Sequence, residues 1–301
     1  KHQIGSDLED LTMLWQVGHK GRAKAHKAKV LRWSDPACIP STVGVTGTKR
    51  ALTLNSILRI NQSREGHLVL PEKVTVPRSE WRVESPLEFF VDFETLSDLD
   101  DDFSAIPEKG GLPLIFMIGC GHIEDGKWLW SEFTVDSLTE PCEAAVIDAW
   151  FNHMEDIRRR IDPHGNDPLV FHWSHAEQST LDTAFNSARK RHSSKRWPHP
   201  RWYDFLELVV REAPVVIRGT FGFGLKSIAG AMYHHGLIST QWPPGPSDGL
   251  SSMIGAWWSA SQARKLNCPL REIQLIQQIQ RYNEADCKVM MEIIEYLRKN
   301  H

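Results

Sequence analysis

The pattern of apolar and polar positions divides the chain into a helical first part and a second part in which strands and helices alternate. Short apolar runs predict four buried strands, at 87–94, 113–120, 127–134 and 169–173. Apolar residues recurring at helical spacing predict four helices, at 143–160, 177–191, 225–236 and 270–299. Strands followed by mixed strands and helices indicate an α/β body covering residues 87–301.

The first 64 residues have a different character, with short helical stretches separated by glycine turns. The segments 17–25 and 43–51 share Val, Gly, Gly and Ala at an offset of 26 residues, which predicts a weak repeat of helix, glycine turn and helix. Residues 65–86 follow, and Pro71, Pro77 and Pro86 interrupt them. We therefore expect a small all-α module at 1–64, a connector at 65–86 and the α/β body at 87–301.

Composition narrows the class of protein. The chain has 301 residues, 41% of them hydrophobic and 24% charged, as in soluble globular proteins. Its apolar runs are shorter than the ~20 residues needed to cross a membrane. The five cysteines are scattered without a C-x-x-C pair, so we expect reduced thiols in the cytoplasm, nucleoid or nucleus. The sequence starts at Lys1 rather than Met, so we expect a trimmed chain or a piece of a longer polypeptide.

Charge is unevenly distributed between the two parts. Residues 1–85 contain 14 basic and 8 acidic residues, whereas the remainder contains 21 basic and 30 acidic residues. Between positions 11 and 64 the ratio is ten basic residues to one acidic residue, Asp35. This pattern favours a polyanion-binding module next to an acidic body, and the alternative is a basic face that only meets solvent.

The stretch VDFET places two carboxylates in an otherwise apolar strand. Residues two apart in a strand point to the same face, so Asp92 and Glu94 share one face while Phe93 lies on the other. Two buried carboxylates repel each other unless a positive group lies between them. Short acidic side chains supply the oxygen ligands that Mg²⁺ and Mn²⁺ prefer. The alternative is a strand end at which both carboxylates meet solvent.

A second acidic position lies in the last predicted helix. Val289, Ile293 and Leu297 form its apolar stripe. Tyr282 and Asp286 are four residues apart and therefore lie on one helical face. A tyrosine one turn from an aspartate can orient a water or a phosphate while the aspartate binds metal. The alternative is a core aromatic beside a solvated acid.

These motifs resemble those of a known family. A D-x-E strand near the start of a domain and a Y-x-x-x-D helix near its end are similar to the first and third motifs of the DEDD exonuclease superfamily, in its tyrosine variant. The sequence most resembles the predicted RNase-H-like nucleases associated with RecB-type proteins. There the domain follows a basic helix–hairpin–helix segment, and the chain often includes a further nuclease or helicase domain.

The resemblance implies an RNase-H-like mixed sheet flanked by helices and a two-metal site. Its second acidic motif corresponds to FHWSHAEQSTLD, where Glu177 takes the position of the family's usual Asp and Asp182 is the rival. The implied ligands of two Mg²⁺ or Mn²⁺ ions are Asp92, Glu94, Glu177 and Asp286. Tyr282 would orient the attacking water rather than deprotonate it, because a free phenol has a pKa of about 10. The implied activity is 3′–5′ exonuclease, with DNA favoured over RNA.

The same resemblance implies a sequence-independent grip on nucleic acid. Glycine turns expose backbone N–H groups to phosphates, and nearby cations add charge. The implied contacts in the first module are Gly18, Lys20, Gly21, Arg22, Lys24, Lys49 and Arg50. Lys226, at a G-x-x-L-K helix start, is a further candidate phosphate contact, with a plain surface lysine as the alternative.

Three other functions are compatible with the sequence. The first is a weakly active or inactive RNase-H-like scaffold that binds nucleic acid within a larger nuclease–helicase protein. The second is an RNase-H-like endonuclease, which uses a similar carboxylate set. The third is a metal-dependent enzyme acting on small nucleotides.

Overall fold

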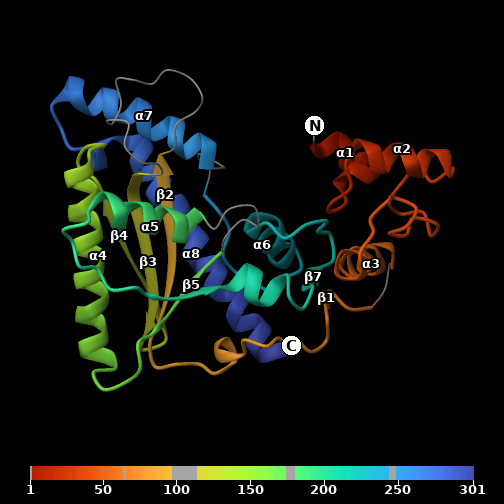
Figure 1. Ribbon diagram of the computed structural model, residues 1–301, viewed down its shortest axis with the longest axis horizontal. Helices are drawn as coiled ribbons and strands as arrows, with labels where there is room; N and C mark the ends of the chain where they lie inside the picture. The colour runs from red at the N-terminus through yellow and green to blue at the C-terminus, as the bar shows by residue number, and fades with distance from the viewer. Residues whose placement is uncertain (1, 64–65, 97–113, 174–179, 244–248) are drawn as a thin grey trace. The chain divides into compact units, whose positions relative to one another are not determined.

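The computed structural model describes residues 2–63, 66–96, 114–173, 180–243 and 249–301 (Figure 1). These residues pack into two compact units. The first unit comprises Lys1–Glu80, Leu206–Ser239 and Ile293–His301, and the second comprises Trp81–Phe205 and Thr240–Glu292. The long C-terminal helix α8 (Gln274–Asn300) contributes residues to both units. Among the described residues, no helix combines the length and apolar character needed to cross a membrane.

The second unit contains a five-stranded mixed sheet in the order β4-β3-β2-β5-β6. Its strands are β2 (Glu88–Leu96), β3 (Leu114–Glu124), β4 (Lys127–Thr134), β5 (Leu169–His172) and β6 (Arg201–Asp204). The first three form an antiparallel meander, and β5 and β6 add in parallel to β2. The strand that carries the D-x-E motif is therefore the central strand of the sheet.

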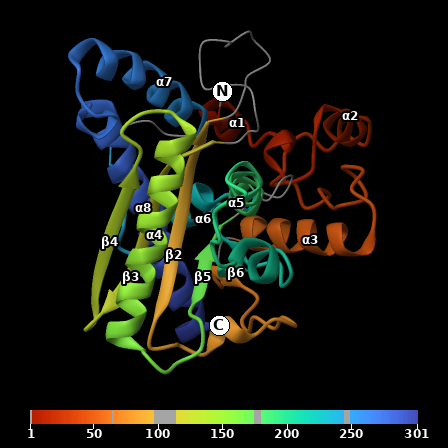
Figure 2. The same ribbon diagram turned by 60° about the vertical axis from the view of Figure 1, so that its left-hand side comes forward.

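Helices cover both faces of this sheet (Figures 1 and 2). On one face Phe93 of β2 meets the Trp150 ring of α4 (Glu140–Ile161) edge-on at 5.6 Å, and α5 (Thr180–Arg191) packs beside α4. On the other face Asp92, the neighbour of Phe93, accepts a hydrogen bond from Asn283 of α8. Helix α7 (Gly249–Leu266) packs against β2 and α8. The two faces of β2 thus separate an aromatic core from a polar site.

The first unit is assembled from three separate stretches of chain. A two-stranded antiparallel ribbon joins β1 (Val69–Leu70) to β7 (Val216–Ile217). Helices α1, α2, α3 and α6 span His2–Asp7, His19–Lys27, Thr48–Gln62 and Leu225–His234. The Asn61 side chain of α3 donates to the Thr220 carbonyl at 2.8 Å and accepts from the Gly219 N–H at 2.7 Å. The C-terminal residue joins the same unit, because the Val74 N–H donates to the His301 carbonyl at 2.7 Å.

The α/β class predicted from the sequence is confirmed, and the sheet is mixed and flanked by helices. The predicted helix at 177–191 is described from Thr180 onward. Helix α7 was not predicted, because residues 242–252 read as a proline- and glycine-rich loop although the helix already begins at Gly249. Packing also groups 206–239 with the N-terminal segment, so the compact units are not contiguous in sequence as the expected segments 1–64, 65–86 and 87–301 are.

The two glycine turns of the expected repeat differ in structure. Gly18 precedes α2 in an extended conformation, whereas Gly47 precedes α3 with a φ of 91°. Gly21 lies inside α2, where an added Cβ would come within 2.5 Å of the Val43 carbonyl oxygen. The second glycine of the first turn therefore permits close packing of the two segments rather than a bend. A helix–hairpin–helix module is not established by this geometry.

A buried ionic network ties the helices α4 and α5 to the sheet. Glu143 is fully buried and accepts two hydrogen bonds from the Arg191 guanidinium, at 2.7 and 2.8 Å. Its carboxylate also accepts from the Ile115 N–H at 2.7 Å and lies 2.8 Å from His192 Nε2. Every oxygen of this carboxylate therefore has partners, as a buried charge requires.

We expect Glu143→Ala to lower the free energy of unfolding of the second unit by about 3–5 kcal/mol, because it leaves the Arg191 charge buried without its partner. Urea denaturation followed by tryptophan fluorescence would measure this change. Glu155→Ala is the matched control on α4, since Glu155 pairs with Arg158 and Arg159 at the surface. Equal, small shifts of the denaturation midpoint in both variants would contradict this account of Glu143.

Candidate metal centre

The second unit brings three of the predicted metal ligands together on one side of the sheet. Asp92 and Glu94 project from the same face of β2, and Asp286 approaches from α8. One oxygen from each carboxylate lies within 4.8 Å of the other two. A register shift between Glu94 and Thr95 interrupts the regular pairing of β2 with β3 directly after the motif. The cluster is thus built from a central strand and a helix almost two hundred residues later in the chain.

The electrostatics of this cluster are unfavourable without a positive charge. Burial raises the pKa of Glu94 well above its ordinary value, and the neighbouring charges of Asp92 and Asp286 raise it further. Hydrogen bonds from Ser252 and Asn283 oppose this shift, but both side chains are neutral. A divalent cation between the three carboxylates would remove the repulsion that these donors only reduce.

Asn283 of α8 holds the cluster from within. Its side chain is fully buried, and its Nδ2 donates to Asp92 Oδ2 at 3.0 Å. Gly119 of β3 pairs with Asp92 across the sheet, and a Cβ at Gly119 would lie 1.7 Å from Asn283 Oδ1. Glycine at this strand position therefore makes room for the amide. Asn283 Oδ1 itself is buried without a hydrogen-bond partner in the part of the chain that the structure describes.

A tryptophan orients the third carboxylate. Trp242 Nε1 donates to Asp286 Oδ1 at 2.9 Å, and the Trp242 ring lies 6.3 Å from the ring of Tyr282. The segment that carries Trp242 is held on α8 by Glu292, which accepts from the backbone and the hydroxyl of Thr240 at 2.9 and 2.8 Å. Tyr282 is buried one helical turn from Asp286, as the spacing predicted.

Glu177 is the fourth metal ligand that the sequence predicts. Glu177 lies outside the described residues, and the side chain of its rival Asp182 is likewise not described. The cluster that the structure defines consequently consists of Asp92, Glu94 and Asp286.

The residues predicted to bind nucleic acid all lie in the first unit, whereas the carboxylates lie in the second. Within the first unit Arg22 pairs with Asp10 at 3.1 Å, Lys24 donates to the Ser41 carbonyl at 2.8 Å, and Lys49 pairs with Glu212 at 2.5 Å. Lys20, Arg50 and Lys226 are exposed, and Lys226 lies in the first turn of α6. The role of this set stays a prediction.

The donor set fits a hard divalent cation. All three groups offer carboxylate oxygens, which Mg²⁺ and Mn²⁺ prefer, and two of the three are partly accessible. The neutral donor Asn283 bonds Asp92 and Glu94, Trp242 bonds Asp286, and Ser252 bonds Glu94. Such outer contacts orient metal ligands without supplying charge.

Comparisons with known proteins identify no relative of this chain. No protein-family model, no curated protein and no solved structure matches the chain. The function must therefore be argued from the geometry of the site.

Sequence reasoning missed the outer contacts of the cluster. The sequence does contain a signal for the contact at Gly119, because a glycine inside an apolar strand indicates a close approach by another group. Asn283, beside Tyr282 in the motif YNEAD, had none, since helical spacing does not reveal which strand atom a side chain will meet. Trp242 and Ser252 are brought to the cluster only by the fold.

We expect Glu94→Gln to stabilise the metal-free protein at neutral pH by about 0.5–2 kcal/mol, because the variant removes a repelled buried charge. A carboxyl with a raised folded-state pKa destabilises the fold once the pH is high enough to ionise it in the unfolded chain, because the folded chain still keeps it protonated. The gain should therefore be absent below the ordinary glutamate pKa and grow as the pH rises through the raised value. Thermal unfolding in EDTA across this range would measure the gain, and a gain that shrinks with rising pH would contradict this assignment.

We expect Asn283→Leu to weaken Mn²⁺ binding about 10- to 100-fold, because Asp92 loses the donor that orients it. Isothermal titration calorimetry of the purified chain would give the dissociation constant. Gln280→Leu is the matched control, since Gln280 lies one turn earlier on α8 and bonds Thr134 outside the cluster. Equal Mn²⁺ affinities in the two variants would rule out a positioning role for Asn283.

Proposed function

We propose that this protein is a metal-dependent nuclease that removes nucleotides from the 3′ end of DNA or RNA. The observation that carries the proposal is the convergence of Asp92, Glu94 and Asp286 to within 4.8 Å, with Tyr282 one turn from Asp286. Three repelling carboxylates maintained by buried donors are costly to a fold unless they bind a cation. The proposal includes Glu177 as a fourth ligand and two Mg²⁺ or Mn²⁺ ions.

The bound ions would supply a nucleophilic water at neutral pH and neutralise charge on the phosphate being cleaved. The chain's own residues would prepare the site for this chemistry. Asp92 and Glu94 hold their positions through a central strand, and Asn283 keeps an Asp92 oxygen engaged. Trp242 donates to one oxygen of Asp286 and so orients that carboxylate. Tyr282, packed beside Trp242, would orient the attacking water or the scissile phosphate.

The finer fold assignment belongs to the same proposal. A meander of three antiparallel strands followed by two parallel strands, with helices on both faces, is compatible with an RNase-H-like domain. Its carboxylates lie on the central strand and on a late helix, as the DEDD resemblance implies. Exposed cations of the first unit, among them Lys20, Arg50 and Lys226, would add a sequence-independent phosphate grip.

We expect 5′-labelled single-stranded DNA or RNA to shorten from its 3′ end in Mn²⁺ or Mg²⁺ and to stay intact in EDTA. Asp92→Asn should abolish cleavage, because it removes a metal ligand. Tyr282→Phe should lower kcat about 100-fold at unchanged Mn²⁺ affinity, since it removes an orienting hydroxyl and no ligand. Gel electrophoresis of the time course would show the ladder.

A circular single-stranded substrate tests whether cleavage needs a free end, because an exonuclease leaves a circle intact. Internal cuts in the circle would replace the exonuclease with an endonuclease. Salt-sensitive binding without any cleavage would favour a scaffold. Unchanged cleavage by Asp92→Asn would remove the cluster from the chemistry altogether.

A further inference from the structure

Helix α7 has an apolar outer face that the fold leaves uncovered. Its inner side is buried through residues such as Met253, Ala256 and Ala263. Leu250, Ile254 and Trp258, spaced by four residues, are each 54% exposed. Residues at this spacing lie along one side of a helix, so the three form a continuous stripe, called here the α7 stripe.

The α7 stripe lies on a helix that reaches the carboxylate cluster. Ser252 of α7 is buried and hydrogen-bonds Glu94, and α7 packs against β2. The stripe begins two residues before Ser252 and continues to Trp258, six residues beyond it. A ligand lying along α7 would consequently run outward from the cluster.

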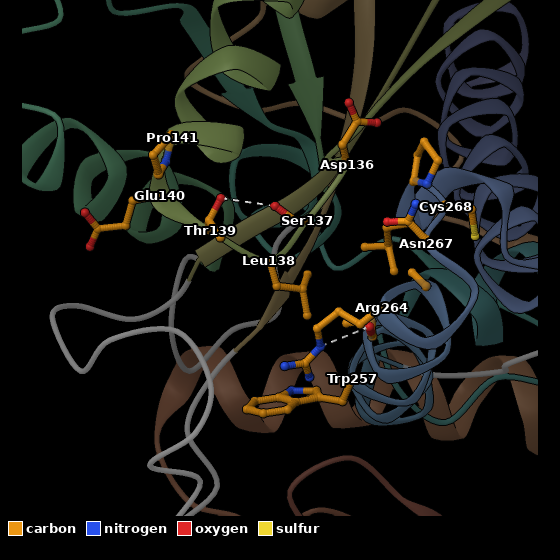
Figure 3. A pocket seen from close by; sticks show the side chains of 14 residues that line it. Asp136, Ser137, Leu138, Thr139, Glu140, Pro141, Trp257, Arg264, Asn267 and Cys268 are labelled. Atoms are coloured by element: carbon orange, nitrogen blue, oxygen red, sulfur yellow. Dashed lines mark hydrogen bonds between the residues drawn. The ribbon is translucent and has the colours of Figure 1, made fainter.

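The charge of α7 differs from that of the body around it. Residues 249–266 contain no Asp or Glu and end in the exposed cations Arg264 and Lys265, although acidic residues outnumber basic ones after residue 85. Arg264 and Trp257 also line a pocket of about 930 Å³ between α7 and the segment leading into α4 (Figure 3). One acid of that pocket, Asp136, is paired with Arg271 at 3.1 Å. The helix is therefore suited to a ligand that is both apolar and anionic.

An unpaired nucleic-acid strand has this combination of properties. Its bases present flat apolar surfaces that pack on indole and aliphatic side chains, and its phosphates pair with cations. In a duplex the bases are stacked on one another and cannot occupy such a surface. A second copy of the chain would cover an apolar stripe equally well, but its own α7 contains no Asp or Glu to pair with Arg264 and Lys265.

We propose that α7 binds an unpaired DNA or RNA strand whose end enters the carboxylate cluster, with bases on the α7 stripe and phosphates at Arg264 and Lys265. This inference rests on the proposed nuclease function and names single strands as its substrate class. The α7 stripe sets that preference, because duplex ends offer no free bases to it.

The test is fluorescence anisotropy of 5′-fluorescein-labelled single-stranded DNA, single-stranded RNA and blunt duplex DNA, titrated with the whole chain in EDTA so that nothing is cleaved. We expect Trp258→Ala and Ile254→Glu each to weaken single-strand binding about tenfold, the range of one lost base contact. Duplex binding should be weaker and unaffected by either change. Leu129→Glu is the matched control, since Leu129 is an apolar residue on β4 that is 42% exposed.

Several results would overturn the inference. Single-strand affinity equal to that of the unmodified chain in both α7 variants, or a loss no larger than in Leu129→Glu, would exclude α7 as the docking surface. A dimer in sedimentation velocity that Ile254→Glu dissociates would assign the α7 stripe to self-association. Far-ultraviolet circular dichroism checks that each variant is folded, and the two α7 changes test the surface independently.

The cleavage assay separates this inference from the proposed function. If the unmodified chain shortens oligonucleotides in Mn²⁺ and the α7 variants do so with unchanged KM, only the α7 inference fails. If the unmodified chain binds single strands through α7 but cleaves none, the nuclease proposal fails and the binding surface stands. Absence of both binding and cleavage would overturn both.

Discussion

Repulsion among three carboxylates is the constraint around which the second unit is organised. Asp92 and Glu94 share one face of a strand, and Asp286 comes from a helix that only the folded unit brings to them. Keeping them within 4.8 Å of one another requires a rigid frame, because any flexible segment would move apart and let water in. This frame has two parts. Strand β2 is the central strand of the sheet, and α8 is a long helix that continues on both sides of Asp286.

The side chains around the cluster orient charge without cancelling it. Asn283, Trp242 and Ser252 are neutral donors, and each contacts a carboxylate. A lysine or arginine in any of these positions would stabilise the metal-free protein and compete with a cation for the same oxygens. Neutral donors instead keep the ligand oxygens in place and leave the negative charge available. The pairing of Asp92 with Gly119, which makes room for Asn283, shows that the sheet accommodates this arrangement at the level of the backbone.

The opposite face of the sheet is packed with aromatic side chains. There Phe93, Trp150 and Trp202 pack edge to face or stacked, and the buried Glu143–Arg191 pair fixes α4 and α5. The same alternation of side chains along β2 thus supplies both an aromatic core and a charged site. In the first unit, by contrast, several basic side chains are engaged by Asp10, Glu212 and backbone carbonyls, so its high positive charge is only partly available to a ligand.

The sequence alone determined those features that depend on local spacing. Alternation along β2 placed Asp92 and Glu94 on one face, and helical periodicity placed Tyr282 one turn from Asp286. Four of the five strands of the sheet and the helices α4, α5 and α8 followed from apolar patterns, so the α/β class was predictable, whereas β6 was not among the predicted strands. Helix α7 was not predicted, because the prolines and glycines near its start indicate a loop. Its apolar residues also surround the helix instead of lining one side.

Only the tertiary structure decided which distant side chains meet. Asn283 reaching Asp92, Trp242 reaching Asp286 and Gly21 packing against Val43 are contacts between residues that no periodicity relates. The joining of 206–239 and the end of α8 to the N-terminal segment is of the same kind. Local patterns specify the face on which a residue lies, but the partner on that face is chosen by packing of the whole chain. The acids could therefore be read from the sequence, whereas the donors that position them could not.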